Sequence, residues 1–141
     1  MNSYSTIPFE PPGAAKSFQR QAEAGLHELI RVGGFDAAYL YSPEGLPLAH
    51  IASANPRVSE LQVVQWVVMI SKMARVMGRL GAVESVHELL LESRQGSKIV
   101  FRFLTLFEQP AVLVLLVPPQ KAYRGLTNRM TKAMEKWATF A

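Results

Sequence analysis

Cysteine is absent from this sequence of 141 residues. Its absence excludes disulfide bridges, zinc sites built on thiolates and cysteine nucleophiles, and it fits a reducing compartment. Long apolar runs are lacking as well: Leu61 to Ser71, the longest uncharged run in the central apolar region, has 11 residues, whereas a membrane-spanning helix needs about 20. The N-terminus also lacks the basic segment and apolar stretch of a signal peptide. We therefore expect a soluble, cytoplasmic protein without membrane insertion.

The motifs of common catalytic sites are missing too. Neither the phosphate-binding pattern GxxxxGKS/T nor the dinucleotide pattern GxGxxG occurs. The three histidines, His27, His50 and His87, fall on three different expected elements and do not have the spacing of metal ligands. Glu88 and Glu92 belong to a scattered set of carboxylates, which an exposed strand face explains better than a general acid and base pair. We expect no catalytic residue, metal site or cofactor.

The positive charge is confined to one segment. The net charge is +4, and residues 1–119 contribute nothing to it, with 10 basic and 10 acidic side chains. Residues 120–141 contain five basic side chains and one acidic one, and 5 minus 1 gives the whole +4. A basic face from Lys121 to Lys136 could contact nucleic acid. Because no recognised binding motif accompanies these charges, we interpret the segment as the solvated face of a helix and expect no nucleic-acid partner.

Apolar periodicity and turn residues divide the chain into eight elements after a Pro-rich arm. The arm is expected to be flexible and to span residues 1–13, followed by one domain over residues 14–141. The expected elements are a helix over 14–32, a hairpin over 36–53 with a Pro43-Glu44-Gly45 turn, a helix over 61–80 with Ser59 as its N-cap, strands over 85–92, 98–105 and 111–117, and a helix over 120–139. The order α-β-β-α-β-β-β-α predicts an α/β fold (an α+β sandwich), in which helices cover both faces of a five-stranded antiparallel sheet.

The helix expected over residues 61–80 has more apolar surface than attachment to a core requires. Ten apolar side chains spread over roughly half its circumference, wider than the stripe of about 100° typical of a surface helix; they are Val63, Trp66, Val67, Met69, Ile70, Met73, Ala74, Val76, Met77 and Leu80. We predict that this wide face packs on the sheet. A second seam begins with Leu61, Val64 and Val68 and continues into Lys72, Arg75 and Arg79. We predict that this seam contacts another protein.

Residues 36–49, with the sequence DAAYLYSPEGLPLA, resemble the signature of Roadblock/dynein light-chain domains. In that family a short apolar strand meets a D/E-G-L-P-I/L-A turn, and the order of elements is the one expected here. The resemblance covers roughly residues 15–138 and implies a Roadblock/profilin-like fold.

The resemblance to this family, and to its MglB-like bacterial or archaeal members in particular, also implies a function. Known members are not enzymes; they form dimers through their middle helices and third strands, and many bind or regulate small Ras-like GTPases. The implied dimer surface includes Leu61, Val64, Val68, Val86, Glu88 and Leu90. Candidate contacts to an MglA-like GTPase are Gln65, Lys72, Arg75 and Arg79.

We therefore expect a non-enzymatic homodimeric regulator or scaffold that binds a small Ras-like GTPase and stimulates its GTP hydrolysis. The alternative is a structural adaptor dimer that holds other proteins without acting on a GTPase, with the Pro-rich arm as the capturing segment. The Pro-rich arm and the chain end directly after the last helix distinguish this sequence from MglB-like proteins.

Overall fold

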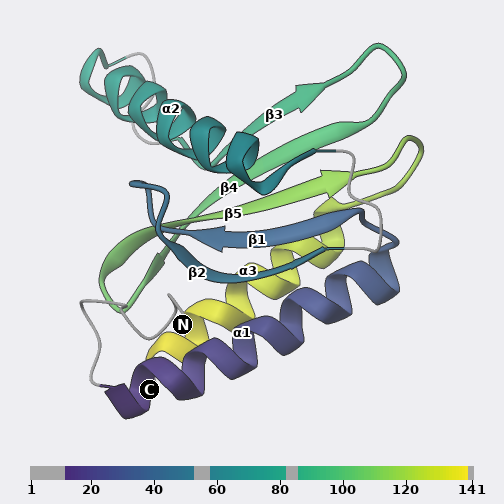
Figure 1. The fold of residues 1–141 in the computed structure, drawn as a ribbon. Coiled ribbons are helices and arrows are strands. Elements are labelled where there is room, and N and C mark those ends of the chain that lie inside the picture. Colours follow the sequence, from purple (N-terminus) through teal and green to yellow (C-terminus); the bar gives the residue numbers. More distant parts are fainter. Residues whose placement is uncertain (1–11, 53–57, 82–85, 140–141) are drawn as a thin grey trace.

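A computed structural model describes residues 12–52, 58–81 and 86–139, and describes side chains from Ser17 onward. It contains the eight predicted elements in the predicted order (Figure 1). Their bounds are α1 Pro12–Gly33, β1 Ala37–Tyr41, β2 Pro47–Ala52, α2 Glu60–Arg79, β3 Glu88–Glu92, β4 Lys98–Leu106, β5 Gln109–Val117 and α3 Arg124–Thr139. The strands form one antiparallel sheet in the order β2-β1-β5-β4-β3. The predicted fold class is confirmed.

The sheet separates two apolar cores. α1 and α3 lie side by side on one face of the sheet, and α2 lies alone on the other (Figure 1). Since side chains alternate between the two faces of a strand, Ala38 and Leu40 of β1 pack toward α1 and α3, whereas Tyr39 and Tyr41 pack toward α2. β5 lies between β1 and β4 and is buried over its whole apolar run, Ala111–Val117, as predicted for a strand covered on both faces.

The turn between β1 and β2 is built as its sequence predicts, and it also anchors α2. Gly45 has a φ of 88° and donates its N–H to the carbonyl of Ser42 at 2.9 Å. A Cβ atom at Gly45 would lie 2.9 Å from Cγ1 of Val64 and 3.2 Å from Cγ2 of Val68. Only glycine fits, both for its positive φ and for this close approach of α2. Beyond the turn, Pro47 starts β2 at an irregularity in its register with β1, as expected for a residue without an N–H.

The ends of α2 also follow the sequence. Ser59 has an extended backbone, and its hydroxyl oxygen accepts the N–H of Gln62 at 3.3 Å, which confirms the predicted N-cap. After the helix, Gly81 has a φ of 75°, the left-handed conformation that commonly terminates helices.

None of the helices in the described part of the chain is long and apolar enough to span a membrane.

Four element boundaries differ from the prediction. α1 begins at Pro12, inside the predicted arm, because proline is well suited to the first turn of a helix; residues 1–11 of the arm lie outside the described residues. β3 begins at Glu88 rather than near residue 85. The turn between β4 and β5 falls on Phe107 and Glu108, both with positive φ, so Pro110 belongs to β5. α3 begins at Arg124, after a positive φ at Gln120.

The predicted wide buried face of α2 is wrong. Only Val63, Val67, Ile70 and Ser71 of this helix are buried. Met69, Met73, Val76 and Leu80, which were assigned to the buried face, are between 42% and 76% exposed. The physical reason is that a single helix resting on a sheet buries only one narrow side.

Candidate functional site

The exposed side of α2 carries two different surfaces. We call the first the apolar stripe: Met69, Met73, Val76 and Leu80, spaced 4, 3 and 4 residues apart and therefore on one flank of the helix. The second, the basic seam, consists of Lys72, Arg75 and Arg79. Gln65 is also exposed and lies two helical turns before Lys72. Lys72, Arg75 and Arg79 line a surface groove of about 600 Å³ together with Val76. None of these three cations forms an ion pair with another described residue.

The remaining predicted contact residues of α2 differ in accessibility. Leu61 is 68% exposed and free to contact a partner. Val64 and Val68 are half-buried against the turn at Gly45. Much of the surface of these two valines therefore already packs within the chain. The flank of α2 with the most exposed apolar side chains is the apolar stripe. Sequence reasoning missed the stripe as an exposed feature, although the excessive width of the apolar face indicated it.

β3 lies at one edge of the sheet and pairs only with β4 within the described residues. An edge strand presents unpaired backbone N–H and C=O groups, which can pair with another chain. Leu90 and Leu91 are exposed on this strand. Leu89 packs into the core beneath α2, so Leu91, two residues on, faces the same side of the sheet as the apolar stripe. Val86, just before β3, is half-buried.

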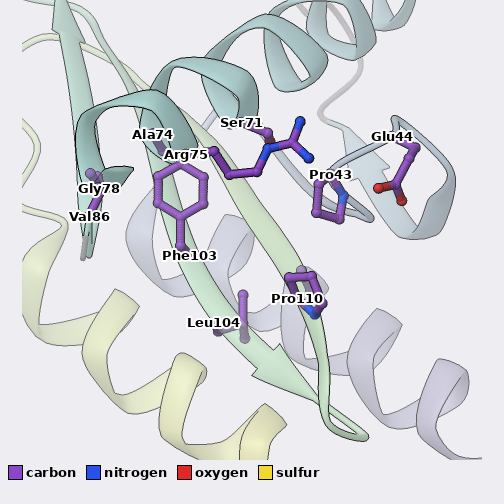
Figure 2. A pocket seen from close by; sticks show the side chains of 11 residues that line it. Pro43, Glu44, Ser71, Ala74, Arg75, Gly78, Val86, Phe103, Leu104 and Pro110 are labelled. Carbon is purple, nitrogen blue, oxygen red and sulfur yellow. The ribbon is translucent and has the colours of Figure 1, made fainter. Parts of the chain in front are cut away.

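A cavity of about 350 Å³ lies between the C-terminal half of α2 and the sheet (Figure 2). Its lining comes from α2, from the turn between β1 and β2, from Val86 just before β3 and from the facing ends of β4 and β5. Figure 2 shows the ring of Phe103 under α2, with the side chain of Arg75 extending along the helix toward Pro43 and Glu44. Arg75 therefore belongs both to the basic seam and to the margin of this cavity.

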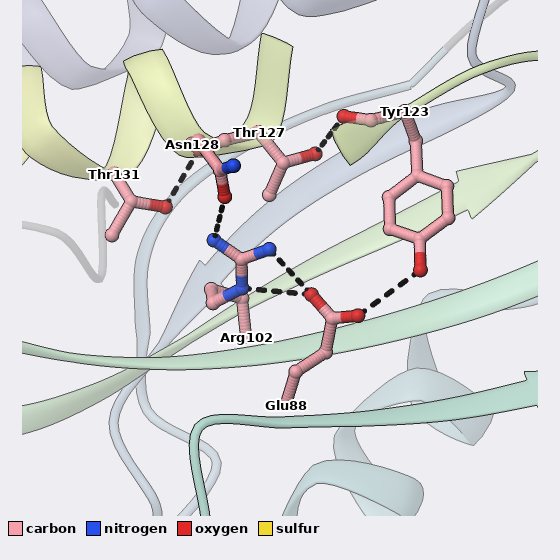
Figure 3. A network of polar contacts seen from close by, with 6 residues as sticks. All are labelled: Glu88, Arg102, Tyr123, Thr127, Asn128 and Thr131. Atoms are coloured by element: carbon pink, nitrogen blue, oxygen red, sulfur yellow. Dashed lines mark hydrogen bonds and ion pairs between the residues drawn. The ribbon is translucent and has the colours of Figure 1, made fainter. Parts of the chain in front are cut away.

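Glu88, the acidic residue of the predicted contact set, points toward Arg102 and Tyr123 (Figure 3). It faces Arg102 directly across the β3–β4 pairing. Nε and Nη2 of Arg102 donate to Oε1 of Glu88 at 2.8 and 2.5 Å, and Nη1 donates to Oδ1 of Asn128 at 2.8 Å. The hydroxyl of Tyr123 donates to Oε2 of Glu88 at 3.0 Å. The expectation that Glu88 lies on an exposed strand face is wrong, because Arg102, 3% exposed, needs a buried counter-charge; Glu92 is exposed as expected.

This polar network fixes the edge strand to the sheet and to α3. Partial burial raises the pKa of Tyr123, and its hydrogen bond to Glu88 raises the pKa further, because the phenol donates to an ionised carboxylate. On the other face of the sheet, burial raises the pKa of Tyr41, reinforced by the charge of Glu60. Both tyrosines are therefore neutral hydrogen-bond donors in the folded protein and have structural roles. The position of Tyr41 in a strand was predicted, whereas Tyr123 lies just before α3 and not within it; the carboxylate partners of both tyrosines were not predicted.

Metal ligands do not gather in the described part of the chain: no group of three or more His, Cys, Asp or Glu side chains is arranged to hold an ion. His50 lies on β2 and its ring stacks on Tyr39, with centroids 6.5 Å apart. Its Nε2 is 3.9 Å from Oε1 of Glu60.

No protein-family model matches the chain, and no curated protein matches it in sequence. The architecture just described defines it as a Roadblock-type fold. The gliding protein MglB from Thermus thermophilus has a TM-score of 0.72 to this chain at 17% identity, over 89% of this chain and 93% of that one. An MglB with a tetrameric arrangement has a TM-score of 0.67 at 18% identity, over 88% and 92%. The Roadblock/LC7 domain from Streptomyces avermitilis has a TM-score of 0.58 at 13% identity, over 81% and 91%. The fold predicted from residues 36–49 and the order of elements is confirmed.

Proposed function

We propose that the protein is a non-enzymatic, cytoplasmic regulator that forms a homodimer and binds a small Ras-like GTPase of the MglA type. The basic seam carries the proposal: three exposed cations without ion-pair partners among the described residues lie on the helix next to an apolar stripe, in a fold similar to that of MglB. Unpaired cations on a helix can bind an acidic surface of a partner without first breaking ion pairs of their own.

The dimer is supported by two adjoining features of the surface. The apolar stripe exposes four large side chains on one flank of α2. Association with another chain that removes such a patch from water is favourable. β3 offers an unpaired strand edge, with Leu91 on the same side of the sheet. A second copy of the chain could cover both features at once by pairing helix with helix and strand with strand. The tetrameric arrangement of a similar MglB is consistent with self-association.

Met73→Asp is expected to separate the dimer into folded monomers. Met73 lies in the middle of the apolar stripe and is 46% exposed in the subunit, so an aspartate is tolerated there until a partner helix covers it. An unpaired charge buried in the interface would then cost several kcal/mol, about 3 or more. Light scattering should show half the wild-type mass, with an unchanged circular dichroism spectrum. Val32→Asp, at an exposed apolar position on α1, is the matched control and should remain dimeric. A dimeric Met73→Asp variant would place the interface elsewhere.

Reversing the charges of the basic seam is expected to weaken GTPase binding strongly. The triple variant Lys72→Glu, Arg75→Glu, Arg79→Glu removes three favourable charge contacts of about 1 kcal/mol each, which corresponds to roughly a 100-fold loss of affinity. Titration calorimetry with an MglA-like GTPase loaded with a non-hydrolysable GTP analogue measures the loss, and single-turnover hydrolysis measures any stimulation. The control reverses Arg129, Lys132 and Lys136 on α3, on the opposite face of the sheet, with the same change in net charge.

The pair of triple variants separates the proposal from its alternatives. Equal loss in both would indicate a general effect of net charge rather than a docking surface. Absence of binding in the wild type, with the dimer intact, would favour an adaptor that does not act on a GTPase.

In the proposed mechanism the dimer orders catalytic groups of the GTPase itself and shifts their population toward the active arrangement. The Arg75→Gln single variant should therefore lower affinity but leave the hydrolysis rate of the saturated complex within a few-fold of the wild-type rate.

A further inference from the structure

The cavity under α2 exists because the helix changes from large to small side chains along its buried side. Val63, Val67 and Ile70 fill the space above the sheet in the first half of α2. Ser71, Ala74 and Gly78 follow at spacings of 3 and 4 and line the cavity in the second half. The resulting space of about 350 Å³ falls within the range of small-molecule binding sites, about 300–1,000 Å³.

The cavity wall is mostly apolar. Phe103 projects toward Ala74 from the sheet, Val86 closes one side, and Pro43 and Pro110 stand at the other (Figure 2). Transfer of a hydrocarbon group from water to such an apolar wall is favourable. A purely polar molecule would lose its hydration without replacement inside such a space.

Two hydrogen-bond donors lie together on the helix side of the cavity. Ser71 is 6% exposed, and its hydroxyl has no hydrogen-bond partner within the described residues. Buried polar groups are nearly always paired, so this hydroxyl is available to donate to a ligand in the cavity. Arg75 follows four residues later, on the same side of the helix, and it has no ion pair in the described part of the chain. Both side chains line the cavity, so one anion bound between them could accept from the hydroxyl and from the guanidinium.

We propose that this cavity binds an aliphatic monocarboxylate of medium chain length, with its carboxylate at Arg75 and Ser71 and its alkyl chain over Ala74, Gly78 and Phe103. A guanidinium and a carboxylate form short charge-assisted hydrogen bonds, and the hydroxyl of Ser71 gains its acceptor. Glu44 stands at the same margin, and its negative charge opposes any anionic ligand, so a ligand with one carboxylate is favoured over a ligand with two. Arg75 is shared with the basic seam, but binding of the carboxylate does not require a partner protein.

The test compares octanoate with octan-1-ol, which has the same chain length without the charge. In titrations of the full-length protein alone, octanoate should shift the amide resonances of residues 71–78 and 103 in a saturable manner, and octan-1-ol should bind at least tenfold more weakly. Arg75→Gln should remove the difference between the two probes. Lys132→Gln, which removes a cation from α3 on the other face of the sheet, should preserve it. Equal affinity of the wild type for both probes, or shifts spread evenly over the surface, would overturn the proposal.

A second variant fills the cavity without changing charge. Ala74→Leu should lower the affinity for octanoate at least tenfold while the midpoint of thermal unfolding stays at or above the wild-type value, because added methyl groups enter empty space. Gly78→Leu fills the same cavity one turn later and provides the test if Ala74→Leu lowers the midpoint. Unchanged octanoate affinity in a folded, filled variant would show that octanoate binds elsewhere. Because no GTPase is present, failure of this proposal is distinct from failure of the proposed function.

Discussion

Replacing Arg102 by alanine is expected to lower the free energy of unfolding by about 3–5 kcal/mol. The guanidinium is almost completely buried and donates to Glu88 and Asn128. Its loss leaves the carboxylate of Glu88, whose side chain is only 13% exposed, without a counter-charge in a poorly solvated site. Since the ion pair joins β3 to β4 and the Asn128 contact reaches α3, the edge of the sheet should loosen first. Urea unfolding and amide hydrogen exchange in β3 would measure both effects.

Two further variants identify burial as the cause. Arg31→Ala breaks another Arg–Glu pair, at 2.8 Å from Glu28 on α1, but those side chains are 63% and 53% exposed. Solvent screening should make the loss there much smaller than the loss caused by Arg102→Ala. The double variant Arg102→Met, Glu88→Leu removes both charges and should be much more stable than Arg102→Ala, because no unpaired charge remains. A double variant less stable than Arg102→Ala would contradict this account.

Val67→Asp is expected to unfold the subunit. Val67 is fully buried in the core between α2 and the sheet, which also contains Tyr39, Tyr41 and Phe101. An aspartate there has no cationic partner in that cluster, and the cost of about 4 kcal/mol or more is a large share of a typical stability of roughly 5–15 kcal/mol. Loss of the near-ultraviolet circular dichroism signal and of cooperative thermal unfolding would report it.

Val76→Asp supplies the contrast on the same helix. Val76 is 42% exposed, so its substitution should leave the monomer folded, with a change of less than about 1 kcal/mol. Val67→Ala keeps the core apolar and should cost about 2 kcal/mol for the lost methyl groups and the cavity left behind. If Val67→Asp melted cooperatively at the wild-type temperature, α2 could not rest on the sheet through this residue.

Local sequence determined the elements and their order, because each boundary depends on the chemistry of a few neighbouring residues. Ser59 caps α2 with its own hydroxyl, Gly45 supplies the positive φ of the first hairpin, and Gly81 terminates α2. The uninterrupted apolar run of β5 identified a strand covered on both faces. The turn motif of residues 36–49, combined with this order, was sufficient to indicate the Roadblock-type fold.

The tertiary structure decided which side chains of those elements remain available. Helical periodicity alone placed Met69 and Val67 on one broad face, but contact with the sheet buries Val67 and leaves Met69 exposed. The partners of Glu88 lie 14 and 35 residues away in the chain, at Arg102 and Tyr123, and no local pattern specifies such a pairing. The cavity likewise depends on Ser71, Ala74 and Gly78 facing Phe103 across two separate elements. Secondary structure follows from neighbours in sequence, whereas burial, charge pairing and cavities depend on which distant segments the folded sheet brings together.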